Sequence, residues 1–284
     1  MEIGIGFPGL FAGVDRQLLL TWARRAEAAE FDCLCSGERL ASETPELMTT
    51  LAMVGAVTER IRLMSTVALL PLHSTGFITK QVATLDVMTQ GRFTFGVGVG
   101  HRPQDYAAAG IDKPSRLDRF EQQLAYMRRQ WAGTPADGEP QIGPPTFTRG
   151  GPRVLVGPLT PKAARRAALC DGIASFGASP AEHLEVYNSA REAWTEAGRE
   201  GKPYFAAGAF FAVGPDADAK CHEYLAWHHS AGPSQLYYDK FTIAESKIAE
   251  AMEQFAAIGV DEFYFVPTIA EVDQVDRLAE LVRV

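Results

Sequence analysis

The sequence predicts an α/β fold, a TIM (β/α)8 barrel with loop insertions, on three observations. Short apolar segments alternate with amphipathic helical segments along all 284 residues. Each strand is followed by a helix, which is the order found in parallel sheets. Eight strands can be assigned, the number that closes a barrel, whereas an open doubly wound sheet of that many strands would need a longer chain. Because no repeat or linker divides the chain, we expect residues 1–284 to form a single domain.

In the first half of the chain, turn residues separate apolar strands from helices with apolar residues at helical spacing. Asp15 places a negative charge in the first turn of the first helix, Pro45 begins the second, and Gln90-Gly91 ends the third. The expected strands are residues 3–7, 31–36, 61–70 and 93–97, and the expected helices are 14–30, 44–58, 74–89 and 116–131.

In the second half, Pro161 and Gly259 mark a helix start and a helix end. The expected strands are residues 154–156, 172–176, 204–213 and 262–266, and the expected helices are 161–169, 180–197, 217–227, 243–258 and 272–282. Residues 132–153 are rich in proline and glycine and are too long for an ordinary connection, so they predict a functional loop or a lid.

Composition excludes several classes of partner. A net charge of −8 and a pI near 5.3 disfavour nucleic acid and an anionic membrane surface. No apolar run is long enough to span a membrane, and no secretory signal opens the chain. The four cysteines, two of them Cys33 and Cys35 in an apolar strand, are expected to be buried free thiols in a reducing compartment. We therefore expect a cytoplasmic protein.

The stretch from Gly91 to His101 ends in three glycines spaced by valines. Gly96-x-Gly98-x-Gly100 does not match a dinucleotide fingerprint, because the third glycine position falls at His101 and Pro103 follows. In a barrel these glycines lie at the C-terminal mouth, where active sites are built. Bare backbone there predicts a binding surface, and a tight loop needing positive φ is the alternative.

A second candidate site follows the strand at residues 154–156. Gly157, Leu159 and Thr160 lead into a helix that begins at Pro161, so free N–H groups could bind a phosphate. Gly177, after the next strand, could complete the cradle. An ordinary capped helix is the alternative.

The candidates for proton transfer are Glu38 and His101. Glu38 follows the second strand and is the carboxylate best placed to meet His101 across the mouth, although a surface ion pair to Arg39 or Arg102 is equally compatible. His73 follows the third strand and could also face a pocket. The spacing of the other histidines does not suggest a metal site, and we expect His183 and His222 to lie on the surface.

Motifs along nearly the whole chain resemble the bacterial-luciferase-like superfamily of flavin- and deazaflavin (F420)-dependent oxidoreductases. They are residues 58–63, 69–72, 80–86, 91–100, 102–106, 156–157, 170–172 and 259–262. The resemblance implies FMN, or alternatively coenzyme F420, at the mouth of a TIM barrel.

Position by position, the resemblance implies that Ser65, Thr66 and Val67 form a bulge behind the cofactor ring, which in several members holds a non-proline cis peptide. It implies that Gly98, Val99 and Gly100 flank the ring, and that Gly157, Leu159, Thr160 and Gly177 hold the phosphate. F420-dependent dehydrogenases that the chain resembles carry a histidine and a glutamate where Glu38 and His101 stand here.

Three functions are compatible with these features. The first is a monooxygenase that uses reduced FMN and O2 on a small organic substrate, with a possible separate flavin reductase and with residues 132–153 shielding the site. The second is an F420-dependent hydride-transfer enzyme, and the third is a cofactor-free, non-catalytic ligand-binding relative. Phe7, Phe11, Tyr106 and Phe147 suggest an apolar rim, and the resemblance implies a homodimer.

Overall fold

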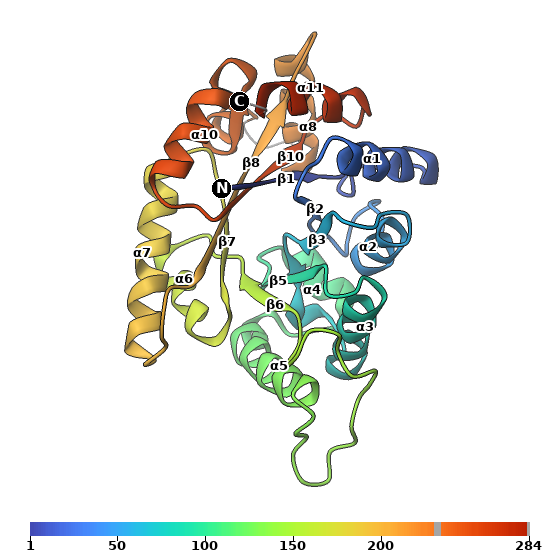
Figure 1. Ribbon diagram of the computed structural model, residues 1–284, viewed down its shortest axis with the longest axis vertical. Helices are drawn as coiled ribbons and strands as arrows, with labels where there is room; N and C mark the ends of the chain where they lie inside the picture. The colour runs from blue at the N-terminus through green and yellow to red at the C-terminus, as the bar shows by residue number, and fades with distance from the viewer. Residues whose placement is uncertain (230–233, 283–284) are drawn as a thin grey trace.

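The computed structural model describes residues 1–229 and 234–282 and forms a parallel barrel surrounded by helices (Figure 1). Eight strands close the barrel in the order in which they occur along the chain, and the last pairs with both the first and the one before it. The barrel strands are β1 (Glu2–Gly6), β2 (Cys33–Ser36), β3 (Arg62–Ser65), β5 (Phe93–Gly98), β6 (Arg153–Val156), β7 (Gly172–Phe176), β8 (Tyr204–Ala212) and β10 (Glu262–Pro267). The predicted TIM barrel is confirmed.

The helices lie outside this barrel, because each buries one apolar face against the strands (Figure 1). Those predicted from apolar spacing are α1 (Arg16–Ala28), α2 (Leu47–Gly55), α3 (Thr75–Met88), α5 (Arg116–Trp131), α6 (Pro161–Ala164), α7 (Pro180–Glu196), α8 (Ala217–His228), α10 (Ile248–Ala257) and α11 (Asp273–Val282). The predicted helix at residues 161–169 is correct only in its first turn, since residues 165–169 continue as a 3-10 helix.

The third predicted strand, residues 61–70, is interrupted. It consists of β3 and a short strand β4 (Ala68–Leu69), with a cis peptide bond between Thr66 and Val67. Ser65 anchors the bulge by donating a hydrogen bond from its Oγ to Gly96 O, 2.7 Å away. The bulge that the resemblance implied is therefore present.

Two α-helices and one strand were not predicted from the sequence. They are α4 (Pro103–Ala109), α9 (Ser234–Phe241) and β9 (Thr242–Ala244). The predicted helix at residues 243–258 is wrong in its first turn, because Thr242 to Ala244 pair in parallel with Phe210 to Ala212 at the end of β8. Strand pairing and the burial of Ile243 override the helix preference of this alanine- and glutamate-rich stretch.

The long connection between α5 and β6 starts and ends at the end of the barrel opposite the mouth, and between those points it runs along α3, where Lys80 Nζ donates to Gly143 O at 3.1 Å and a Cβ on Gly76 would stand 3.5 Å from Ile142. It joins a helix to the start of a strand, and such connections lie at the N-terminal end of a barrel. Thr148 in this loop donates from N and Oγ1 to Asp86 of α3 at 2.8 and 2.9 Å. Phe147 packs at the start of β5, where an added Cβ on Gly91 would stand 2.9 Å from its ring. These contacts hold residues 132–153 against α3, and in Figure 1 the loop extends beyond α5, so they do not support the prediction that the loop shields the site.

The barrel interior is filled by side chains. The ring of Tyr264 occupies the space where a Cβ on Gly208 would stand, 2.2 Å from the ring. Cys33 and Cys35 point inward with it, fully buried and free, as the sequence predicted, and burial raises the pKa of both thiols. None of the helices in the described part of the chain is long and apolar enough to cross a membrane.

Candidate active site

The mouth of the barrel, at the C-terminal ends of the strands, collects the βα connections. The longest of these is the insertion between β8 and α10, which contains α8, α9 and β9. Within it, the Lys240 carbonyl accepts a hydrogen bond from Ala178 N at 2.9 Å, so α9 reaches the mouth above β7. This insertion lies over the mouth.

The floor of the mouth is formed by the ends of β3, β4 and β5. Thr66 and Val67 of the bulge are partly exposed, as are Val99 and Gly100, while Ser65 and Gly98 are buried beneath them. Tyr106, itself buried, donates its hydroxyl to the Val99 carbonyl and fixes the end of β5. The predicted ring-binding residues thus come together in one surface of backbone and small side chains, the kind of surface that a flat ring requires.

The glycines beneath this floor accommodate the bulge itself. A Cβ on Gly98 would stand 2.6 Å from Val67 Cγ2, and one on Gly157 would stand 2.7 Å from Val67 Cγ1. A Cβ on Gly96 would stand 1.9 Å from the carbonyl oxygen of Ser65. Only Gly100 is required for its own conformation, with φ of +69°. Bare backbone at Gly96 and Gly98 therefore makes room for the bulge and not directly for a ligand.

Glu38 pairs with His73, not with His101. His73 Nε2 lies 2.9 Å from Glu38 Oε1 and 3.0 Å from Oε2, and Leu69 N donates to Glu38 Oε2 at 2.5 Å. The Glu38 side chain is 8% exposed and that of His73 is 18% exposed. Burial alone would lower the pKa of His73, but the hydrogen bond and charge of Glu38, with Glu46 nearby, raise it. The expected contact between Glu38 and His101 is corrected accordingly.

His73 is therefore the functional candidate to which the sequence analysis gave no partner. Its backbone is held firmly, because its carbonyl accepts from Arg119 Nη2 and Gln123 Nε2, each at 2.9 Å. A carboxylate and an imidazole in hydrogen-bond contact beside the bulge can hold and transfer a proton. The signal in the sequence was the position of His73 directly after the third strand.

His101 lies on the other side of Gly100, exposed and among basic groups. Lys113 Nζ donates to its carbonyl at 2.6 Å. Partial burial lowers the pKa of the imidazole, and the charges of Arg39, Lys113 and Arg102 lower it further. His101 is therefore neutral at pH 7 and has no carboxylate partner within the described residues.

The predicted phosphate cradle is assembled, but two of its glycine amides are already used. Gly157 N donates to Val97 O and Gly177 N to Gly208 O, both at 2.8 Å. Leu159 and Gly177 do line a common cavity of about 240 Å3, together with Lys240 and two carboxylates, those of Glu182 and Glu185. The cradle is thus reduced to Leu159 and Thr160, both exposed at the start of α6.

His183 lines the same cavity and is buried, so its predicted surface position is wrong. Its Nδ1 accepts from Ser175 Oγ at 2.6 Å and its Nε2 donates to Gly177 O at 2.8 Å. Burial lowers its pKa, and both ring nitrogens are occupied in the neutral form. It ties α7 to the end of β7.

Only part of the predicted apolar rim lies at the mouth. Phe11 packs on Tyr224 of α8 with ring centroids 4.5 Å apart, whereas Phe7 and Tyr106 are buried. Phe147 is 63% exposed but lies at the opposite end of the barrel. The α8–α9 insertion supplies other rings. The ring centroids of His229 and Tyr237 are 3.8 Å apart in a stacked arrangement, and those of Phe241 and Phe176 are 6.1 Å apart.

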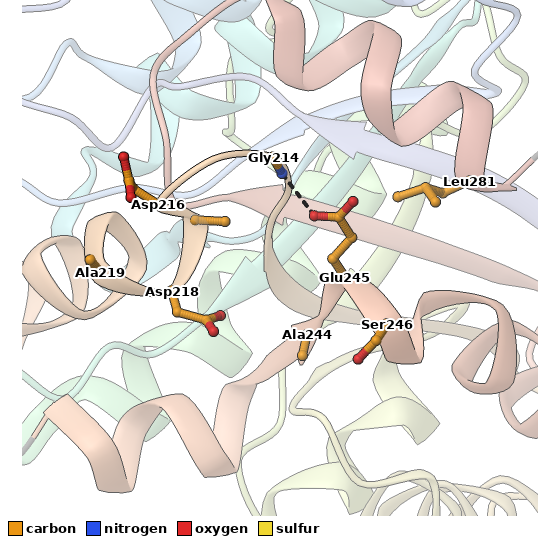
Figure 2. A pocket seen from close by; sticks show the side chains of 9 residues that line it. Gly214, Asp216, Asp218, Ala219, Ala244, Glu245, Ser246 and Leu281 are labelled. Carbon is orange, nitrogen blue, oxygen red and sulfur yellow. Dashed lines mark hydrogen bonds between the residues drawn. The ribbon is translucent and has the colours of Figure 1, made fainter.

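A larger cavity lies away from this floor. Its volume is about 750 Å3. Figure 2 shows its lining residues at the start of α8, at the end of β9 and just after it, and on α11. Asp216, Asp218 and Glu245 line it, and Gly214 N donates to Glu245 Oε2 at 2.8 Å. No residue predicted for the site is among those described as lining it, and its carboxylates disfavour a phosphate.

Together, the barrel and the floor at its mouth define a TIM-barrel protein, and the C-terminal ends of its strands are the candidate ligand site. Residues 7–283 match the family model described as luciferase-like monooxygenase, and the chain belongs to that family. Predicted membership of the luciferase-like superfamily is thereby confirmed.

Individual relatives include a monooxygenase and an F420-dependent dehydrogenase. Over 90 residues, 32% of this chain and 24% of the relative, the chain is 37% identical to 4-hydroxyprotoasukamycin monooxygenase of Streptomyces nodosus subsp. asukaensis. The chain spans between 24% and 56% of the length of the curated relatives that it matches.

Two solved structures share the fold. An F420-dependent secondary alcohol dehydrogenase in complex with an F420–acetone adduct superposes with a TM-score of 0.80 at 18% identity, covering 99% of this chain and 98% of the other. The oxygenating constituent of 3,6-diketocamphane monooxygenase of Pseudomonas putida, in complex with FMN, gives a TM-score of 0.75 at 16% identity, with the same coverage.

Proposed function

We propose that this protein is an oxidoreductase that binds a flavin-type cofactor at the mouth of the barrel and acts on a small organic substrate. The observation that carries the proposal is the partly exposed floor of Thr66, Val67, Val99 and Gly100 beside the Glu38–His73 pair. A flat surface and a proton-transferring pair side by side are what redox chemistry on a bound ring requires.

The residues present fit the ring better than they fit the phosphate. Thr66, Val67 and Gly100 would lie against the ring, while Leu159 and Thr160 would supply the remaining donors for a phosphate. When bound, reduced FMN would supply the electrons that activate O2, and F420 would accept a hydride from an alcohol or, when reduced, return one to a carbonyl. Reduced FMN would come from a separate flavin reductase.

Residues of the chain itself would transfer the proton and exclude water from the site. Glu38 holds His73 in place and keeps its pKa raised, so that His73 can donate a proton to the oxygen of a substrate at the mouth. The rings of the α8–α9 insertion, among them Tyr237 and Phe241, would cover the floor and exclude water. This cover favours monooxygenation with FMN, in which exclusion of water matters most.

Hydride transfer with F420 is the second candidate, and the Glu38–His73 pair favours it. Oxidation of an alcohol requires a base for the hydroxyl proton, and a buried carboxylate–imidazole pair is suited to that task.

Titration of the purified protein with FMN and with F420, followed by cofactor fluorescence, tests the proposal. We expect saturable binding of one of them, and turnover that falls at least tenfold in Glu38→Gln and His73→Gln. His101→Ala is the matched comparison, and we expect it to retain turnover within a few fold. Absence of binding for both cofactors would leave a non-catalytic ligand-binding relative and would refute the oxidoreductase.

A further inference from the structure

Four basic or imidazole side chains converge at the mouth from three separate connections. Arg39 follows β2, His101 and Arg102 follow β5, and His229 ends α8. Arg39 Nη1 donates to the His228 carbonyl at 2.6 Å, which joins the first connection to the insertion. We call Arg39, His101, Arg102 and His229 the mouth cluster.

The mouth cluster lacks an anion. Within the described part of the chain, neither Arg39 nor Arg102 forms an ion pair. Asp105 also faces the cluster, but its Oδ1 accepts from the backbone N of Ala41 at 2.8 Å. Arg102 Nη1 and His229 Nε2 are buried without a hydrogen-bond partner in the described structure. Buried polar atoms without partners are rare and costly in native proteins, and a guanidinium nitrogen can only donate, so an oxyanion at Arg102 is the missing partner that this geometry indicates.

The electrostatics of the cluster agree with that geometry. Burial, and then the charge of Arg102, lower the pKa of Arg39 to about 10. Burial, and then Arg39 and His101, lower the pKa of His229 to about 4. With both histidines neutral at pH 7, the two guanidinium groups of Arg39 and Arg102 remain as like charges held close together, and a bound anion would relieve their repulsion.

We propose that the mouth cluster is a subsite for a carboxylate or phosphate group on the substrate, with Arg102 as its principal ligand. That the anion belongs to the substrate rests on the proposed redox function, whereas the anion site itself does not. The substrate class is then a small organic acid or phosphate ester whose reacting carbon reaches the floor while its charged group stays at Arg39 and Arg102.

Binding of benzoate and of its neutral analogue benzamide tests the subsite, measured by calorimetry on the protein without cofactor. We expect benzoate to bind and benzamide to bind at least tenfold more weakly. Arg102→Gln should weaken benzoate binding at least tenfold, and Arg102→Lys should retain part of the affinity that Arg102→Gln loses. Arg24→Gln is the control for the change in net charge, because Arg24 is exposed on α1. Circular dichroism verifies that each variant is folded.

The outcomes separate this proposal from the proposed function. Equal benzoate affinity in the wild type and Arg102→Gln would overturn the subsite. Loss of FMN or F420 affinity in Arg102→Gln, with benzoate binding unchanged, would assign the cluster to the cofactor and overturn the assignment to the substrate. Arg102-dependent benzoate binding in a protein that binds neither cofactor would support the anion site and refute the oxidoreductase.

Discussion

At the residue scale, the Glu38–His73 pair is the most informative contact in the molecule. Its carboxylate is held from two directions, by the Leu69 amide and by the His73 ring, and it is nearly buried. Because the pair adjoins the bulge, a change in its charge alters the electrostatic potential at the floor of the site. Protonation of the pair therefore affects both the free energy of unfolding and the proposed proton transfer.

Replacing Glu38 by Gln should lower the pKa of His73, because the charge that raises it is removed. A raised pKa in the folded state stabilises the protein fully below the unfolded value, about 6.5, and the stabilisation is lost as pH rises through the folded value. The variant should therefore lose about 1.5 kcal/mol near pH 5.5 and progressively less above neutral pH.

Urea unfolding across this pH range, with NMR titration of the His73 ring, measures both effects. Glu121→Gln, an exposed carboxylate on α5, provides the matched control. A stability difference that grew with rising pH would contradict the assignment of the pair.

The sequence located Glu38 at the mouth but favoured His101 as its partner, whereas the structure pairs it with His73. His73 and His101 both follow strands that end at the mouth, and the difference lies in the path of the chain after Leu69. That path turns through a 3-10 helix at residues 70–72 and brings His73 back to Glu38. Local spacing carries no signal for such a return, so the choice required the fold.

At the element scale, the β3 bulge and the glycines of β5 are one packing unit. Gly98→Ala places a Cβ 2.6 Å from Val67 Cγ2 and should cost about 2 kcal/mol. With Val67→Ala the remaining contact would be Val67 Cβ at 3.8 Å, an ordinary distance. The double variant should therefore be less destabilised than the sum of the two single variants.

Thermal and urea unfolding of the four proteins gives the coupling directly. Gly96→Ala combined with Val67→Ala is the control, because the Gly96 clash is with the Ser65 backbone oxygen and cannot be relieved in this way. Strict additivity at Gly98 would show that the bulge and β5 do not pack as described.

The connection between α5 and β6 gives a second prediction at this scale. Asp86→Ala leaves the Thr148 N–H and hydroxyl without their acceptor and should cost about 2 kcal/mol. Cofactor and benzoate affinities should not change, since the contact between Asp86 and Thr148 lies at the last turn of α3, away from the mouth. Unfolding curves and binding titrations on the same sample test this prediction. A loss of ligand affinity without a loss of stability would show that residues 132–153 contribute to the ligand site.

At the scale of the whole molecule, the barrel was predictable and its elaborations were not. Parallel strands that are buried on both faces appear in the sequence as apolar runs. The helices between them are recognised by the helical spacing of their apolar residues, so the alternation of eight strands with helices could be predicted. In contrast, β9 has 3 residues and α4 has 7, and tertiary contacts hold such short elements in place. The mouth cluster was equally hidden, because its members come from three distant segments.

The same scale raises the question of assembly. A groove of about 650 Å3 lies between α2 and α3. These two helices lie on the outside of the barrel (Figure 1). Phe77 and Met88 line it and are 75% and 72% exposed, so two large apolar side chains face solvent in one groove. An apolar groove of this kind on two neighbouring helices is suited to a second copy of the chain.

We therefore expect a homodimer that buries this groove, and we expect Phe77→Glu/Met88→Glu to convert it to a monomer, because burying two carboxylates costs several kcal/mol. Light scattering coupled to gel filtration over a dilution series measures the mass of each species. Leu236→Glu, a change at another exposed apolar residue on α9, should remain a dimer. A wild-type protein that is monomeric at every concentration would contradict the dimer, and a double variant that stays dimeric would place the interface on another face.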